Sequence, residues 1–101
     1  MNTYFRAQTK NISFDNLKNH ISADGGDGME EFGGVCACIT VSDLLRNTVM
    51  DALEDDDEVI IFKGRELCEI YDGYRVEPIA AIVILTIAEF RSNPPYEYET
   101  L

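Results

Sequence analysis

The segment from Ile79 to Ala88 is the most apolar in the chain and contains no charged side chain. It is about half the length that a membrane-spanning helix needs. Its many isoleucine and valine residues favour a central strand that is buried on both faces of a sheet. A buried helix is the alternative, because a continuous apolar run has no periodicity that would separate the two structures. At 101 residues the chain is expected to form one domain with a real core.

Further strands are predicted where apolar and β-branched residues alternate with polar ones or run together. These segments are Thr3–Thr9, Val35–Val41, Val59–Lys63, Glu66–Tyr71 and Tyr74–Glu77. Gly64 is expected to end the strand before it. Asp72 and Gly73 give a strong hairpin signal, because Asp-Gly suits the tight turn between antiparallel strands. Pro78 is expected to break the ladder or to sit at a bulge, because it has no N–H to donate.

Two helices are predicted from capping residues and apolar spacing. Ser13 is expected to cap a short helix, and Ser42 a second helix that extends to Leu53. In the first helix Phe14, Leu17 and Ile21 share one face. The predicted fold is therefore an α+β domain over residues 1–92, with about five mostly antiparallel strands and two helices on one face. Residues 93–101, which include two consecutive prolines, are expected to form an extended tail.

The cysteine content favours a reducing compartment. There are three cysteines, and on a strand Cys36 and Cys38 would point the same way, about 7 Å apart, which exceeds disulfide reach. A zinc site that uses Cys68 and His20 is disfavoured, because structural zinc sites usually carry closely spaced cysteine pairs twice over. We therefore expect free thiols, no metal or other cofactor, and a soluble cytoplasmic protein. The first residues also lack the apolar segment of a secretory signal.

The chain is strongly acidic. Nineteen acidic side chains against eight basic ones give a formal net charge of −11, which disfavours direct nucleic-acid binding because the phosphate backbone is repelled. The acids gather in a glycine-rich loop after the first predicted helix, in the run Glu54–Glu58, near the hairpin and in the tail. The run would lie at the C-terminal end of a helix, which is the unfavourable end of its dipole. This cost suggests a role beyond helix stability, and a solvated linker is the alternative.

No catalytic residue is predicted. The glycine-rich loop departs from a calcium loop that starts at Asp24, because Gly26 stands where a ligand is needed, so a weak cation site is only an alternative to a plain acidic loop. The phosphate-binding glycine motifs are absent from the sequence. The single histidine, His20, lies among polar neighbours, which favours a surface position over a catalytic dyad.

One enzyme hypothesis stays open. Arg6 on an early strand, Thr40 and Ser42 after a central strand, and Glu69 or Glu77 on a late strand loosely resemble the Arg-Ser-Glu layout of ADP-ribosyltransferases. The resemblance implies a small transferase that binds a nicotinamide dinucleotide. The chain is short for that fold and has no obvious aromatic pair to stack on the nicotinamide ring.

In size, charge and free cysteines, the chain resembles small acidic inhibitors encoded by phages and other mobile elements, including anti-CRISPR proteins and other nucleic-acid mimics. The residues that carry this resemblance are Glu54, Asp55, Asp56, Asp57 and Glu58, with Asp24, Asp27, Glu30 and Glu31. It implies a stoichiometric binder without catalysis that blocks the nucleic-acid channel of a basic effector protein. Carboxylates on a rigid domain can occupy phosphate positions and pair with arginine and lysine there.

We therefore expect these nine acids to bind a basic, nucleic-acid-binding partner protein, without direct contact to nucleic acid or membrane. Tyr71 and Tyr74 flank the predicted hairpin turn and are expected to anchor the partner, because tyrosines among polar groups are common interface anchors. Core packing is the alternative for Tyr71. A homo-oligomer that pairs an edge strand across a two-fold axis is a third hypothesis.

Overall fold

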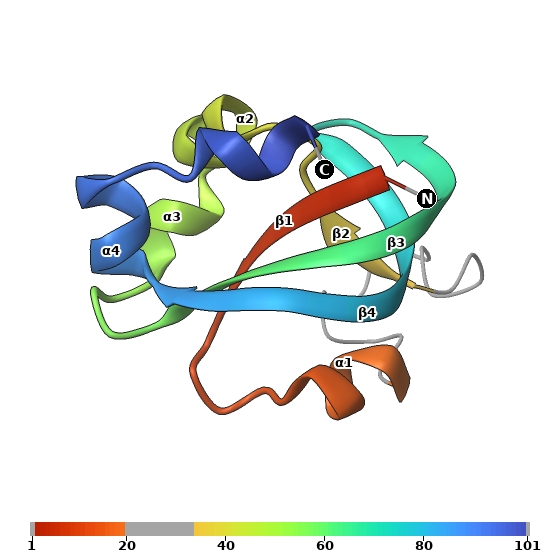
Figure 1. Ribbon diagram of the computed structural model, residues 1–101, viewed down its shortest axis with the longest axis horizontal. Coiled ribbons are helices and arrows are strands. Elements are labelled where there is room, and N and C mark those ends of the chain that lie inside the picture. The colour runs from red at the N-terminus through yellow and green to blue at the C-terminus, as the bar shows by residue number, and fades with distance from the viewer. Residues whose placement is uncertain (1, 20–33, 101) are drawn as a thin grey trace.

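A four-stranded antiparallel sheet organises the structure, a computed structural model that describes residues 2–19 and 34–100. The strands are β1 (Asn2–Gln8), β2 (Val35–Ala37), β3 (Glu58–Ile70) and β4 (Gly73–Thr86). Their order in the sheet is β1-β3-β4-β2, and every neighbouring pair is antiparallel (Figure 1). The predicted α+β class and the predicted antiparallel pairing are confirmed.

The two longest strands each join segments that the sequence predicts as separate strands. β3 continues through Gly64 and β4 through Pro78, so the described residues contain four strands and the expected number of about five is wrong. The register shifts between Lys63 and Gly64, and Gly64 lies opposite Pro78. A bulge lets a strand bend sharply without ending, which confirms the bulge at Pro78. At Gly64 a Cβ atom would overlap the Val76 side chain, so the bend needs glycine.

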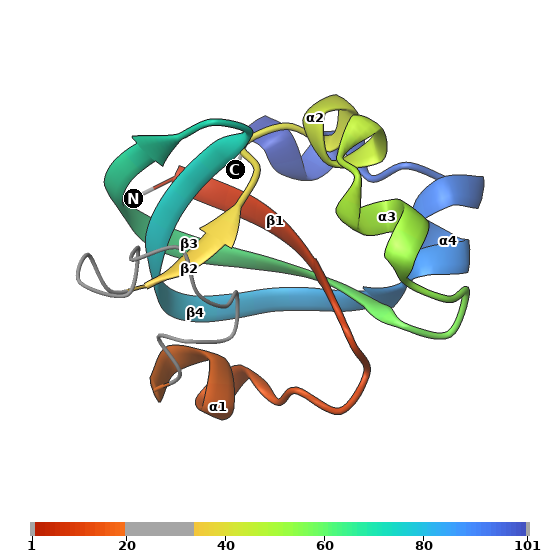
Figure 2. The same ribbon diagram turned by 180° about the vertical axis from the view of Figure 1, so that it is seen from behind.

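The sheet curls back on itself at one end. Phe5 of β1 and Cys38, just after β2, exchange two backbone hydrogen bonds of 2.8 and 2.9 Å. Figure 2 shows β2 between β4 and β1 at this end. β2 pairs with β4 only at Tyr74–Val76. At the other end of the sheet, among the residues that the structure describes, Glu77–Thr86 pair with β3 alone.

Helices cover both faces of the sheet. They are α1 (Phe14–Asn19), α2 (Val41–Arg46), α3 (Val49–Ala52), α4 (Ile87–Ser92) and the 3-10 helix η3 (Tyr96–Thr100). Phe5 and Ile61 pack in the core cluster that contains residues of α2, α3 and α4. Tyr4 and Phe62 point the other way and pack with Leu17 of α1. The prediction of two helices on one face is therefore wrong, because α1 lies on the face opposite the other three.

The predicted helix from Ser42 to Leu53 is divided in two. The N-cap of the first of these helices is Thr40 and not Ser42 as predicted, because the Thr40 hydroxyl accepts a hydrogen bond from the Asp43 backbone N–H at 3.0 Å. The first helix ends at Asn47, which has extended backbone angles, and the Asn47 side chain accepts the Val49 N–H at 3.0 Å. A side chain that bonds to nearby backbone competes with helical hydrogen bonding. Ser13 does act as the predicted cap of α1, accepting the Asn16 N–H at 3.1 Å.

The apolar run Ile79–Ala88 is a strand only as far as Thr86, and α4 begins at Ile87. None of the residues from Ile79 to Thr86 is buried, so the expected burial on both faces is wrong. The physical reason is the short β2, which leaves this half of β4 with only one neighbouring strand among the described residues.

The C-terminal segment folds back onto the sheet, whereas the sequence predicts an extended tail. Tyr96–Thr100 form η3 next to β1, and Tyr98 packs against the core. Glu99 accepts the Val41 N–H at 2.6 Å and so caps the start of α2. Across the described residues, no helix combines the length and apolar character needed to cross a membrane.

Candidate protein-binding surface

The β3–β4 turn presents an aromatic side chain to solvent. Tyr71 is fully exposed at the turn, next to the exposed Asp72. Gly73 follows and begins β4, where a Cβ atom would lie 2.6 Å from the carbonyl oxygen of Ala37 on β2. Glycine therefore allows the turn to approach β2 closely. The predicted Asp72-Gly73 hairpin is confirmed, with Ile70 opposite Gly73.

The β3–β4 turn is hydrogen-bonded to Asn47 at the end of α2. The Asn47 side-chain amide donates to an Asp72 carboxylate oxygen at 3.4 Å. The same amide lies 3.9 Å from the Cys38 sulfur, whose thiol in turn lies 3.9 Å from the Asp72 carbonyl oxygen. Burial raises the pKa of the Cys38 thiol to about 11, with further contributions from the negative charges of Asp43 and Asp72. The Cys38 thiol is therefore mainly protonated near neutral pH and packs as a neutral group.

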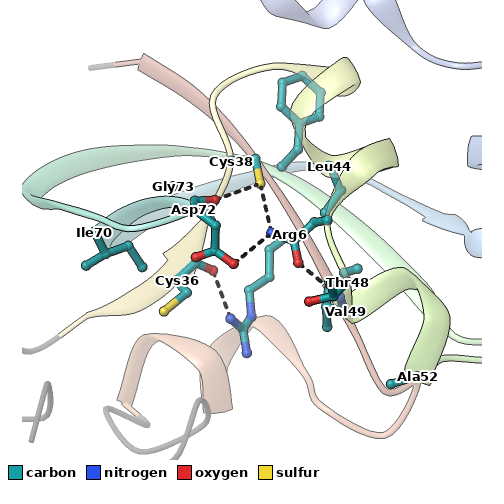
Figure 3. Close-up of a pocket in the computed structure, with 14 residues that line it drawn as sticks. Arg6, Cys36, Cys38, Leu44, Thr48, Val49, Ala52, Ile70, Asp72 and Gly73 are labelled. Atoms are coloured by element: carbon teal, nitrogen blue, oxygen red, sulfur yellow. Dashed lines mark hydrogen bonds between the residues drawn. The ribbon is translucent and has the colours of Figure 1, made fainter. Parts of the chain in front are cut away.

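Two neighbouring hollows flank this connection. The first, of about 400 Å³, lies between β1, the hairpin and the α2–α3 segment. Figure 3 shows Ile70 and Asp72 of the hairpin on one side of it and Leu44, Val49 and Ala52 on the other. Its Arg6 guanidinium donates to the Cys36 carbonyl oxygen at 2.9 Å.

The second hollow, of about 360 Å³, is the more acidic. Its lining includes Asp43, Glu69, Tyr71, Asp72 and Tyr74, which we call the hairpin surface. Arg46 also lines it and pairs with Asp43 at 2.9 Å. The ion pairs found among the described residues include neither Glu69 nor Asp72. The hairpin surface therefore combines an exposed aromatic ring with two carboxylates that are not engaged in those ion pairs.

The acidic run Glu54–Glu58 has a structural role. The Asp57 carboxylate accepts the Glu54 N–H at 2.8 Å and the Lys10 N–H at 3.2 Å. The Asp57 and Asp55 carbonyl oxygens accept the N–H groups of Ile87 and Ala88 at the start of α4. The expectation that these charges lie at the unfavourable end of a helix is therefore incomplete. The run also faces the N-terminus of α4, where negative charge is favourable.

Two carboxylates of this run are paired with cations. Lys10 forms an ion pair with Asp56, and Arg91 lies 3.9 Å from Asp55. The hydrogen bond and charge of Asp56 raise the pKa of Lys10, and those of Lys10 lower the pKa of Asp56. Both side chains remain about half exposed, so the run adds negative potential to the surface without being fully neutralised.

The predicted binding residues are therefore not all in one place. The acidic run lies between α3 and β3 beside α4, away from the β3–β4 turn (Figure 1). Tyr74 is half-buried and packs edge-to-face on Tyr4 at 6.4 Å, so it is partly a core residue. The loop acids Asp24, Asp27, Glu30 and Glu31 lie outside the described residues. The sequence analysis missed Asp43, because only the tertiary fold brings α2 to the turn.

No match was found. Comparisons with protein-family models, with curated proteins and with solved structures identified no similar protein. The function proposed for this chain therefore depends on its own residues.

Most of the basic side chains are either buried or paired with an acidic side chain. Arg6 and Arg75 are buried and act inside the fold, where Arg75 contacts the Cys36 sulfur at 3.4 Å and the Gly34 carbonyl oxygen at 3.1 Å. The exposed arginines Arg46, Arg65 and Arg91 each form an ion pair with an acid. Together with Lys10, which pairs with Asp56, six of the eight basic side chains are therefore buried or paired with an acid.

The residues of the transferase hypothesis have separate surroundings. Arg6 lines the first hollow and Glu69 the second, whereas Glu77 pairs with Arg65 at 2.7 Å. The Thr40 hydroxyl caps α2. A transferase site would need these side chains around one cavity, so this layout lends the enzyme hypothesis no support.

Proposed function

We propose that this protein is a non-catalytic binding domain whose hairpin surface takes up a basic segment of a partner protein. The observation that carries the proposal is the fully exposed Tyr71 side chain at the β3–β4 turn, with Glu69 and Asp72 beside it. A tyrosine combines a large apolar ring with a polar end, so it contributes strongly to an interface when a partner covers it.

The chemistry of the second hollow favours an arginine or lysine side chain as its occupant. Asp43, Glu69 and Asp72 outnumber Arg46, the only basic residue of its described lining. A guanidinium group forms paired hydrogen bonds with carboxylates and stacks on aromatic rings, and Tyr71 supplies such a ring. The hydrogen bond from Asn47 to Asp72 holds the turn in place, which reduces the entropy lost on binding.

The net charge of −11 supports a partner that normally binds nucleic acid. Such a partner carries a basic groove, and carboxylates can take the positions of phosphates within it. The acidic run would act mainly through its potential, which raises the association rate, while the hairpin surface would make the direct contacts. The outcome is a stoichiometric inhibitor of the kind that phages and mobile elements encode.

Two charge-matched triple variants test this proposal. One carries Asp43→Asn, Glu69→Gln and Asp72→Asn in the hairpin surface. The other carries Glu54→Gln, Asp55→Asn and Asp56→Asn in the acidic run, and both remove the same net charge. The probe is a fluorescent arginine-rich peptide, titrated by anisotropy. The hairpin variant should weaken binding by about tenfold or more, and the control by no more than about threefold.

Equal losses in the two triple variants would contradict the hairpin surface and indicate diffuse charge attraction instead. A single-residue comparison adds a second criterion. Tyr71→Phe keeps the aromatic ring and should retain most of the affinity for the peptide. Tyr71→Ser removes the ring and should lose most of that affinity. A basic protein captured from host lysate by the wild type and lost from the hairpin variant would then give the physiological partner.

A further inference from the structure

Within the described residues, the second half of β4 forms an apolar strand edge with which no further strand pairs. From Ile79 to Thr86 every residue is at least partly exposed, and Ala80, Ala81 and Ile84 are exposed outright. Ile84 is 46% exposed and is one of the largest hydrophobic side chains on the described surface. We call the segment Ile79–Thr86 the β4 edge.

The backbone of the β4 edge has a ladder partner on one side. Val83–Thr86 pair in regular register with Glu58–Ile61 of β3. Within the described part of the chain, no strand pairs with the other side of this segment. In an antiparallel strand, alternate residues direct their N–H and C=O groups away from the neighbouring strand. Such an edge is a template for a further strand.

The edge lacks most of the features that natural proteins use to block such pairing. Lysine, inward-pointing charge and proline are the usual devices, and the sequence from Ile79 to Ala88 contains none of them. A bulge at Ile82, where Ile61 faces Val83 and Phe62 faces Ala81, interrupts the ladder on the side toward Pro78. The regular part, from Val83 to Thr86, is therefore where a new strand would begin to pair.

We infer that the β4 edge binds the same edge of a second copy of this chain, in antiparallel orientation across a two-fold axis near Ile84. An antiparallel strand pair is compatible with two-fold symmetry, so one surface serves as its own complement. At about 3.3 Å per residue the edge is roughly 25 Å long. Pairing would join the two four-stranded sheets into one continuous sheet.

Charge decides between a second copy and the basic partner as the occupant. The segment from Pro78 to Ala88 has 11 residues without a charged side chain, and only Phe32–Ser42 is an equally long uncharged stretch of the sequence. Two copies with a charge of −11 each repel one another, and along the β4 edge they can touch without opposing carboxylates on the paired strands. A basic partner finds no carboxylate to pair with along this stretch. The hairpin surface would therefore bind the basic partner, and the β4 edge would bind a second copy of the chain.

Sedimentation of the purified full chain tests the inference. Between about 5 and about 300 µM, the weight-average mass should rise from the monomer value of 11.4 kDa toward twice that value. Ile84→Lys places a charge on the exposed edge and should keep the protein monomeric over this range. Leu67→Lys is the matched control, because Leu67 is 40% exposed on β3, away from the β4 edge. It should dimerise like the wild type.

A wild-type mass that stays at 11.4 kDa at all concentrations would overturn the inference. So would dimerisation of Ile84→Lys at the wild-type concentration, or loss of dimer in Leu67→Lys as well. Hydrogen exchange of the wild type is a second test, which does not depend on whether Ile84→Lys folds correctly. The amides of Val83–Thr86 should become more protected as concentration rises, and unchanged protection would equally refute the pairing.

Discussion

Single side chains decide which chemistry this protein offers to its surroundings. Cys38 is buried between the hairpin and α2, and burial raises the pKa of its thiol to about 11. At pH 8 only about one Cys38 in a thousand is then a thiolate, far fewer than for an ordinary cysteine. We predict that iodoacetamide at this pH modifies Cys36 and Cys68, which are partly exposed, before Cys38.

Peptide mapping after timed alkylation checks this order. All three thiols should react at similar rates in denaturant, because unfolding removes the burial that suppresses the Cys38 thiolate. Native-state labelling of Cys38 as fast as that of Cys68 would contradict the burial argument. It would also weaken the description of the turn as a rigid support for Tyr71.

At the level of secondary-structure elements, α4 begins with a reciprocal pair of hydrogen bonds. The Thr86 hydroxyl accepts the Glu89 N–H at 3.0 Å, and the Glu89 carboxylate accepts the Thr86 N–H at 2.9 Å. The hydrogen bond that the Thr86 backbone N–H donates to the Glu89 carboxylate, with a smaller contribution from the Thr86 side chain, lowers the pKa of Glu89. A lowered folded-state pKa contributes stability above the unfolded-state pKa, and this is lost as pH falls through the folded value.

We therefore predict that wild-type protein loses more free energy of unfolding than Glu89→Gln when the pH falls from about 6 to about 3. Glutamine keeps an acceptor for the Thr86 N–H but does not titrate. Urea titrations at several pH values measure the difference. In a Thr86→Ala background the same Glu89→Gln change should alter the pH slope only slightly less, because the hydroxyl is lost while the backbone N–H of residue 86 still donates to Glu89. Parallel slopes in all four proteins would exclude the proposed role of Glu89.

Local signals in the sequence predicted the elements whose geometry is local. The Asp72-Gly73 turn, the Ser13 cap and β1 are set by residues close together in the chain, and all three are present in the structure. The continuation of β3 through Gly64 depends on a bulge opposite Pro78, and this pairing is tertiary. For the same reason the exposure of the β4 edge was not predictable. It depends on the short β2, not on the apolar run itself.

At the scale of the whole molecule, the sequence predicted an acidic surface correctly but not how that surface is divided. The acidic run forms ion pairs with Lys10 and Arg91 and accepts backbone hydrogen bonds from the start of α4. The hairpin surface instead gathers Asp43 and Asp72 from segments that are distant in the chain. Composition reports the total charge, whereas the fold determines which carboxylates are engaged and which face solvent beside an exposed ring.

The two proposed contacts respond to salt in opposite directions. Copies of a chain with a charge of −11 repel each other, and added salt screens that repulsion, so pairing through the uncharged β4 edge should tighten. Attraction between the hairpin surface and a basic peptide is screened by the same salt and should weaken. Raising sodium chloride from about 50 to about 500 mM shortens the screening length from roughly 14 to roughly 4 Å, enough to separate the two effects.

Sedimentation and anisotropy in the same buffers measure both responses on one protein preparation. The dimer dissociation constant should fall by several-fold, while that of the arginine-rich peptide should rise by about tenfold or more. The hairpin triple variant should flatten only the peptide's salt dependence, because it leaves the β4 edge unchanged. If salt weakens dimerisation as well, charged groups must contribute directly to the contact between copies. The assignment of self-association to the uncharged stretch from Pro78 to Ala88 would then be wrong, whether or not the hairpin surface binds the peptide.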